Sequence, residues 1–349
     1  MKCTIQNIAD HLGLSRNTVS KALKNSSEAS ENTRNLVIKT ASKLGYKNAT
    51  FATPVIPASE TGSNGTILFL TRTYASDSEF WTTVLRGIES ILSNANYHLA
   101  ISIMSDSDLK QLNFPQTISD SSIKGIILVE ICDKVVCDAL SQFNLPIVSV
   151  DMPNVPFEEL NGIDVVTMES KKNLKKIINQ LIEKGAESFG FVGDLYSPNV
   201  SRGFQERYNA LSECLAEHQL PLNQKNCLLH QTPEDFRNFQ TTVNNLQAMI
   251  SLPDVFICGN DWTAIQLIYA LQFLGFQIPK DICVVGFDNI PAASRISPSL
   301  TTISTPQKYL GIAAARQILE RIQHPNCPHV FCQYETELII RNSTNITSF

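Results

Sequence analysis

Hydrophobic residues recur at helical spacing in the first part of the chain. Ile5, Ile8, Ala9 and Leu12 fall on one face, and polar residues fill the other. Thr4 precedes this stretch and can cap a helix there, because its hydroxyl can accept a hydrogen bond from a free backbone N–H. The pattern therefore predicts a helix that begins at Ile5.

A second helix is predicted after Ser15, because a hydroxyl residue again precedes an apolar period and Gly13 allows a tight turn. Its inward-facing residues are apolar: Val19, Ala22 and Leu23. Its outward-facing residues are long and polar: Arg16, Asn17 and Lys21. Two short helices joined by a glycine turn, with such a face on the second, are typical of a domain that places a helix in a DNA major groove.

A third helix is predicted to stabilise these two. Ser30 can cap it, and Gly45 is well placed to end it. Its apolar side comprises Leu36, Val37, Thr40, Ala41 and Leu44. We therefore predict a helix-turn-helix DNA-binding domain over residues 1–47.

The pattern changes beyond this domain. Residues 48–64 are rich in alanine, threonine, serine and proline, and this composition indicates a linker or hinge. Short apolar strands then alternate with amphipathic helices. The predicted strands are 66–70, 99–104, 125–129, 146–150, 189–192, 255–258 and 282–287. The predicted helices are 80–95, 171–184, 205–218 and 263–274. This alternation predicts an α/β fold with parallel sheets covered on both faces.

Two such runs meet near residue 163 and predict two similar lobes within residues 65–349. We expect the first lobe to hold 65–163 and 291–323, and the second to hold 164–290 and 324–349. Ligands of open parallel sheets bind beyond the carboxyl ends of the strands. The residues at those ends are polar or aromatic: 72–80, 194–207, 260–261 and 288–289. They suit a small polar ligand bound between the lobes.

The charge of the chain divides in the same way. Residues 1–50 hold eight lysines and arginines against three acidic residues, whereas the whole chain has a net charge of −5. A basic head on an acidic body indicates that the head meets phosphate and the body does not. The alternative is a solvated helical head whose charge excess is accidental.

Composition restricts the class of protein further. With 43% hydrophobic and 17% charged residues, the chain is globular rather than disordered. No apolar run is long enough to cross a bilayer, and the first residues lack the apolar core of a signal peptide. We therefore expect a cytoplasmic protein that associates with the bacterial nucleoid, and reduced cysteines, among which Cys258 and Cys283 should be core residues.

Metal and enzyme chemistry are not expected. His324, Cys327, His329 and Cys332 crowd together like metal ligands, but two prolines interrupt the segment, so we predict no metal and no cofactor. The chain lacks a Gly-x-Ser-x-Gly elbow, a phosphate loop, a dinucleotide fingerprint and a His-Glu-x-x-His motif. Two alternatives to a DNA-binding regulator remain: a sugar-binding protein without a regulatory role, and an α/β enzyme.

Several motifs occur in a fixed order along almost the whole chain. The head holds Ser15-x-x-Thr18-Val19-Ser20, Thr33-Arg34 and Leu44-Gly45-Tyr46. The body holds Leu85-Arg86-Gly87-Ile88-Glu89, Asn260-Asp261, Pro279-x-Asp281-Ile282-x-Val284-Val285-Gly286-Phe287-Asp288 and Leu300-Thr301-Thr302-Ile303. In this order they resemble the lactose-repressor (LacI/GalR) family of bacterial transcription regulators. The resemblance implies a core like that of sugar-binding periplasmic proteins, a homodimer, and operator binding controlled by a ligand.

The resemblance also assigns the residues that contact DNA. Arg16, Asn17 and Lys21 occupy base-reading positions, since arginine can pair with guanine and asparagine with adenine. Arg16 could instead contact phosphate only. Five further residues are better placed to contact phosphates, which position the protein but do not specify a sequence: Thr4, Ser15, Thr18, Ser30 and Asn32. Ser20 completes the implied DNA-binding set. We therefore predict a sequence-specific regulator of transcription that acts as a repressor on a double-stranded DNA operator.

An effector site between the lobes is implied in the same way. Its residues are Phe80, Trp81, Arg207, Phe236, Asn260 and Asp288. An arginine, an aspartate and an asparagine between aromatic walls suit the hydroxyls and flat faces of a sugar. For Phe80 and Trp81 the alternative is ordinary packing within the lobe.

The sequence departs from the family pattern at two places. The family forms a hinge helix on DNA, from which a leucine wedges into the minor groove. Here the wedge position is Val55 and follows Pro54, which disfavours helix at the residue before it and cannot donate a hydrogen bond. We predict that residues 48–62 stay irregular or form at most a short turn before Pro54. Met168 replaces an aspartate common in the family, which changes the expected ligand set.

Overall fold

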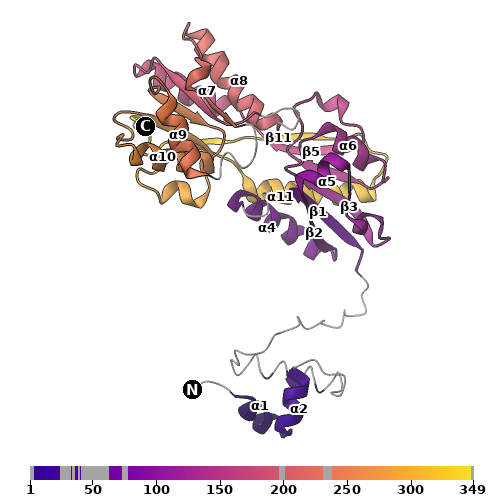
Figure 1. Cartoon of the computed structure of the whole chain (residues 1–349). Coiled ribbons are helices and arrows are strands. Elements are labelled where there is room, and N and C mark those ends of the chain that lie inside the picture. The colour runs from indigo at the N-terminus through magenta and orange to yellow at the C-terminus, as the bar shows by residue number, and fades with distance from the viewer. Residues whose placement is uncertain are drawn as a thin grey trace. The chain divides into compact units, whose positions relative to one another are not determined.

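The computed structural model describes residues 4–23, 33, 36–37, 40, 63–72, 78–195, 201–230 and 238–346. The chain divides into two compact units, Met1–Gly62 and Ser63–Phe349, and each is described by itself (Figure 1). None of the described helices is long and apolar enough to cross a membrane.

The first two helices of the small unit form as the sequence predicts. α1 spans Ile5–Leu12, and Thr4 caps it in a reciprocal capping box with Asn7. Gly13 ends α1 in the left-handed conformation, at φ 65°, which glycine adopts without steric cost. α2 spans Arg16–Leu23, and the Ser15 hydroxyl accepts a hydrogen bond from the backbone N–H of Thr18 at 3.0 Å.

The core of this unit is small and apolar. Among the described residues, five form its buried cluster: Ile8, Ala9, Val19, Ala22 and Val37. In the stretch predicted as a third helix, the four described positions are helical. Thr40 is buried there as predicted, but Leu36 is half exposed, so its assignment to the apolar side was wrong. Leu36 lies at the margin of the stripe that Val37 and Thr40 define. Ser30, Ala41, Leu44 and Gly45 lie outside the described residues.

The large unit contains two six-stranded sheets. The first has the strand order β11-β5-β4-β3-β1-β2, and all its pairs are parallel. Its strands are β1 (Thr66–Arg72), β2 (His98–Met104), β3 (Ile123–Val129), β4 (Ile147–Val150), β5 (Ile163–Met168) and β11 (Phe331–Tyr334).

The second sheet has the order β12-β10-β9-β8-β6-β7 and is parallel except for the pair β10–β12. Its strands are β6 (Phe189–Asp194), β7 (Leu228–His230), β8 (Val255–Cys258), β9 (Cys283–Asp288), β10 (Thr301–Ser304) and β12 (Glu337–Ile339). The predicted α/β class with two parallel-sheet lobes is confirmed.

Eight α-helices are described in this unit. They are α4 (Glu79–Asn94), α5 (Asp106–Gln111), α6 (Lys134–Ser141), α7 (Lys172–Glu183), α8 (Arg202–Glu217), α9 (Phe239–Ala248), α10 (Asp261–Phe273) and α11 (Gln307–Gln323). α4 and α11 pack closely along one another (Figure 1). Their close approach depends on Gly87 and Gly311, because a Cβ at either position would overlap a backbone carbonyl oxygen of the other helix.

The predicted division of the lobes was wrong at three places. β5 pairs with β4, so residues 164–168 belong to the first lobe. β10 pairs with β9, which places residues 301–304 in the second lobe. β11 pairs with β5, so the chain returns to the first lobe near its end before β12 joins the second. Apolar runs indicate strands, but their partners are fixed by backbone hydrogen bonds that a linear pattern does not encode.

The eight described cysteines are free, and Cys258 and Cys283 are buried as predicted. Among the described residues, no group of three or more histidine, cysteine or acidic side chains is placed to hold a metal.

Candidate functional site

In the small unit, the outward face of α2 carries the predicted base-reading residues. Arg16 and Asn17 are exposed in the first turn, whereas Lys21 and Ser20 are half buried. Val19 is fully buried on the opposite side and fixes which face turns outward. Arg16 and Asn17 are therefore free to meet base edges in a groove, and their role as base readers stays a prediction.

The predicted phosphate-binding residues of this unit serve first as helix caps. The Thr4 hydroxyl accepts from the Asn7 N–H at 3.3 Å, and the Ser15 hydroxyl lies 2.8 Å from that of Thr18. Thr4 and Ser15 are exposed, so phosphate can still reach them, and Thr18 is half buried beside Ser15. Ser30 and Asn32 lie outside the described residues.

In the large unit, Arg207 is the most buried of the predicted polar effector residues. Its side chain comes from α8 and is only 3% exposed. Nη1 donates to the carbonyl oxygen of Gly259 at 2.6 Å, and Cζ lies 3.6 Å from the ring centroid of Phe287. Burial lowers the pKa of Arg207, while the carboxylates of Asp288 and Asp151 oppose this shift. Nε is buried without a hydrogen-bond partner among the described residues, so the guanidinium can still bind a further acceptor.

Asp288 ends β9 in a conformation that is costly for a residue with a side chain. Its φ is 115°, and its backbone carbonyl accepts hydrogen bonds from Gln307 Nε2 at 2.6 Å and Thr305 Oγ1 at 3.2 Å. Burial raises the pKa of its carboxyl well above the usual range, and the nearby Arg207 opposes that rise. The carboxyl group makes no hydrogen bond to another described residue, so it can accept one from a ligand.

Asn260 and Asp261 divide two tasks at the end of β8. The side-chain oxygen of Asn260 caps α10 by accepting the Thr263 N–H at 2.8 Å. Asp261 is fully buried and accepts from Thr302 Oγ1 at 2.5 Å and from the Ile290 N–H at 2.9 Å. Asp261 thus fixes the loop that leaves β9, whereas Asn260 fixes the start of α10 and keeps its amide nitrogen for a ligand.

The predicted aromatic residues differ in accessibility. Phe80 is 6% exposed within the main hydrophobic core, and its ring meets that of Trp81 edge to face at a centroid distance of 4.6 Å. Phe80 thus packs within the lobe, whereas Trp81 is half buried and retains an accessible part, and the role of either residue at an effector site stays a prediction. Met168 is also buried in the core, at the end of β5, and Phe236 lies outside the described residues.

Two further polar residues lie beside Arg207 that sequence reasoning missed. Asp151 follows β4 at φ 73° and is 7% exposed, and Ser170 follows β5 and is 1% exposed. A Cβ on Gly203 would lie 3.6 Å from Asp151 Oδ2, 3.5 Å from Ser170 Oγ and 3.4 Å from Arg207 Nη2. Burial raises the pKa of Asp151, and Ser201 and Arg207 oppose it. Asp151 could have been found, because it directly follows a predicted strand.

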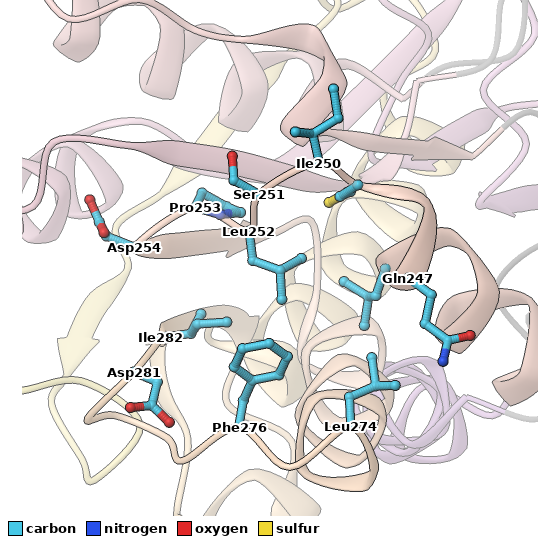
Figure 2. Close-up of a pocket in the computed structure, with 12 residues that line it drawn as sticks. Gln247, Ile250, Ser251, Leu252, Pro253, Asp254, Leu274, Phe276, Asp281 and Ile282 are labelled. Carbon is cyan, nitrogen blue, oxygen red and sulfur yellow. The ribbon is translucent and has the colours of Figure 1, made fainter.

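A separate pocket lies at the opposite end of the second sheet. Its volume is about 470 Å³, and Leu252, Phe276 and Ile282 point into it, with Asp254 and Asp281 at one side (Figure 2). These residues stand before β8 and β9 rather than after them. The pocket contains none of the predicted effector residues.

Comparison with known proteins agrees with both units. Residues 4–48 match bacterial regulatory proteins of the lacI family, and residues 178–344 match a periplasmic binding protein-like domain. The transcriptional repressor PurR of Photobacterium profundum is 26% identical over 345 residues, covering 97% of this chain and 98% of the relative. The ribose operon repressor of Haemophilus influenzae is 26% identical over 344 residues, with the same coverage.

Two solved structures share the fold. A lacI-family regulator of Enterococcus faecium with bound ribose has a TM-score of 0.65 and 24% identity, and the match covers 80% of this chain and 98% of that one. The lac repressor dimer bound to its operator has a TM-score of 0.67 and 19% identity, with 99% of both chains covered. The matched models and the full-length relatives cover the head and the lobes in the order in which this sequence holds them. The chain therefore belongs to the lacI family of bacterial regulatory proteins.

Proposed function

We propose that this protein is a transcriptional repressor whose α2 helices read an operator and whose lobes bind a sugar effector. The observation that carries the effector assignment is the buried Arg207 guanidinium. Its Nε lacks a partner among the described residues, and it lies near Asp288, whose backbone has a φ of 115° and whose carboxyl makes no hydrogen bond to another described residue. Both polar groups therefore keep hydrogen-bonding capacity that a ligand can use.

The DNA-binding half of the proposal rests on the exposed start of α2. One head reads only a half-site, and two heads gain affinity through effective concentration, so we propose a homodimer on an approximately palindromic operator. Large apolar side chains on α10 support a dimer: Trp262 is 42% exposed, Tyr269 42% and Phe273 68%. A second copy of the chain would cover them.

The effector half rests on the chemistry of the strand ends. A guanidinium, a carboxyl and an amide nitrogen from Arg207, Asp288 and Asn260 can together donate to and accept from neighbouring hydroxyls, and Trp81 supplies an apolar face. A sugar has both features. The Enterococcus faecium regulator with the same fold holds ribose, which makes D-ribose a rational first ligand to test.

Effector binding by the lobes and operator binding by the heads must be linked thermodynamically if one is to control the other. A ligand changes DNA binding only through its different affinities for two lobe arrangements. We propose that closure of the lobes changes the spacing of the two heads, with a coupling of roughly 1–3 kcal/mol. Residues 48–62 lie outside the described residues, and we keep the proposal that Pro54 prevents a regular hinge helix there, so that specificity rests on the major groove.

The test begins with ligand discovery. Thermal unfolding should be followed with D-ribose, other sugars, sugar phosphates and nucleobases, because a ligand of the native state raises the unfolding temperature by mass action. Gel shifts on an operator selected from random DNA then show whether the ligand weakens or strengthens binding. Sequence-specific binding without any effect of a stabilising sugar would refute the regulatory half. Binding of sugar without affinity for any DNA would favour a sugar-binding protein that has no regulatory role.

A further inference from the structure

Gly203 and Arg207 lie one turn apart on the same face of α8. In an α-helix the Cα–Cβ bonds tilt toward the N-terminus, so a long side chain runs back over the preceding turn. The Arg207 side chain does so here and brings Nη2 within 3.4 Å of the place where a Cβ of residue 203 would stand. Gly203 is itself buried, so its missing side chain leaves room for the guanidinium.

The place above Gly203 is bounded by three polar side chains from three elements. Besides Arg207 they are Asp151, after β4 in the first sheet, and Ser170, after β5. The Ser170 hydroxyl has no hydrogen-bond partner among the described residues, although it is 1% exposed. A side chain of more than one carbon at position 203 would have to displace at least one of these groups. Arg207 has the longest and most flexible side chain of the three.

We infer that Gly203 is the positioning residue for Arg207 and thereby helps decide which ligands the site accepts. With glycine at this position, the guanidinium lies over the Phe287 ring, donates to the Gly259 carbonyl and leaves Nε without a hydrogen-bond partner among the described residues. A larger residue moves the guanidinium off the Phe287 ring, and a hydroxyl bound at its old place loses a charge-assisted donor. This step to the ligand rests on the proposed function, whereas the placement of Arg207 does not.

The space at position 203 sets the size of side chain that leaves Arg207 in place. A methyl group at position 203 would meet its neighbours at 3.4–3.6 Å, which is ordinary contact. Alanine therefore fits, and the arrangement predicts that larger residues fail in order of size.

The first experiment needs no ligand. Nuclei held over an aromatic face are shifted by its ring current, so the full-length protein should show one displaced arginine Nε–Hε signal, assigned by its loss in Arg207→Met. The signal should persist in Gly203→Ala. It should move toward the position of exposed arginines in Gly203→Val and further in Gly203→Leu. Ser212→Leu, which places the same leucine side chain on the opposite face of α8, should leave it in place.

Two results of this series would contradict the positioning role of Gly203. An unchanged signal in Gly203→Leu, or in Gly203→Val if the leucine variant does not unfold cooperatively, would overturn it. Equal displacement by Ser212→Leu would also overturn it, because general strain on α8 would then explain the effect.

The second experiment joins position 203 to the ligand. D-ribose affinity should fall about tenfold or more in Gly203→Leu and in Arg207→Met, and the double variant should bind no more weakly than Arg207→Met alone. Additive losses would overturn the positioning role. If the wild-type protein binds neither D-ribose nor another sugar, the proposed function fails, while the spectroscopic series still decides whether Gly203 places Arg207.

Discussion

Replacing Asp164 by alanine should destabilise the large unit more than most single substitutions. Asp164 is fully buried in β5. Its carboxylate accepts hydrogen bonds from Arg321 Nε at 2.9 Å, Arg321 Nη2 at 2.8 Å and the Val330 N–H at 2.8 Å. This one side chain therefore ties the end of α11 and the approach to β11 onto the first sheet.

The magnitude follows from what the substitution leaves behind. Removing one partner of a buried ion pair costs about 3–5 kcal/mol, because the remaining charge is uncompensated. Arg321 would retain three backbone acceptors, the carbonyls of Pro325, Cys327 and Pro328. They partly solvate the charge, so we expect the lower end of the range, about 3 kcal/mol. For a unit that spans Ser63–Phe349, with an unfolding entropy of about 2.1 cal/mol/K per residue, that lowers the unfolding temperature by roughly 5 °C.

Urea unfolding at pH 7 measures the effect, and two variants serve as controls. Glu335→Ala removes an exposed ion pair with Lys172, 3.1 Å long, and should cost no more than about 1 kcal/mol. The double variant Asp164→Ala, Arg321→Met should recover most of the loss, because no buried charge remains. An Asp164→Ala variant within about 1 kcal/mol of wild type would refute the reasoning, and so would a double variant no more stable than the single one.

The pH dependence of this difference has a definite sign. Burial raises the pKa of Asp164, but the hydrogen bonds from Arg321 and Val330 outweigh it and hold the pKa below its usual value. The stabilisation is therefore fully present above about pH 4, the unfolded pKa, and is lost as the pH falls through the lower folded pKa. Wild type and Asp164→Ala should converge in stability under acidic conditions.

Four further outcomes are expected. Arg16→Ala and Asn17→Ala should each weaken operator binding by about 1–3 kcal/mol and relax discrimination at one base position; unchanged sequence preference in both would move base readout elsewhere. Sedimentation should show a dimer at micromolar concentration, and a monomer both free and on DNA would contradict it. In gel shifts, Asp288→Ala and Arg207→Ala should abolish the effector response, and a normal response would remove that residue from the site. Burial raises the pKa of Asp261 to about 7, so its contribution to stability should be present below about pH 4 and fall by a few kcal/mol as the pH rises through 7; the difference between wild type and Asp261→Asn in unfolding midpoint measures this, and a flat difference would contradict it.

Local chemistry made the small unit predictable from sequence. Thr4, Gly13 and Ser15 act within a few residues of their own positions, and each does in the structure what its type and spacing indicate. The place of the polar residues at strand ends was also predictable, because parallel strands bring their carboxyl ends to one edge, and their role in effector binding stays a prediction. The structure also shows backbone strain at those ends, such as the positive φ of Asp288, which cannot be predicted from the residue type.

Contacts between distant segments were not predictable in the same way. The lobe crossings depend on which strand accepts β10 and β11, and the pair Asp164–Arg321 joins residues 157 positions apart. The crowded histidines and cysteines near residue 327 illustrate the consequence. Their spacing resembles a metal site, yet this loop supplies backbone carbonyls to Arg321 at its prolines and at Cys327.

The placement of Arg207 depends both on local sequence pattern and on contacts between distant segments. Its place on α8 and the polar strand ends opposite follow from sequence periodicity, but the position of its guanidinium does not. That position depends on a ring at the end of β9 and a carbonyl after β8, and we infer that it also depends on a small residue one turn earlier. On that inference, ligand specificity would change through residue 203 while every polar residue of the proposed site stays the same, because such a site is defined by where the charge lies as well as by which residue carries it.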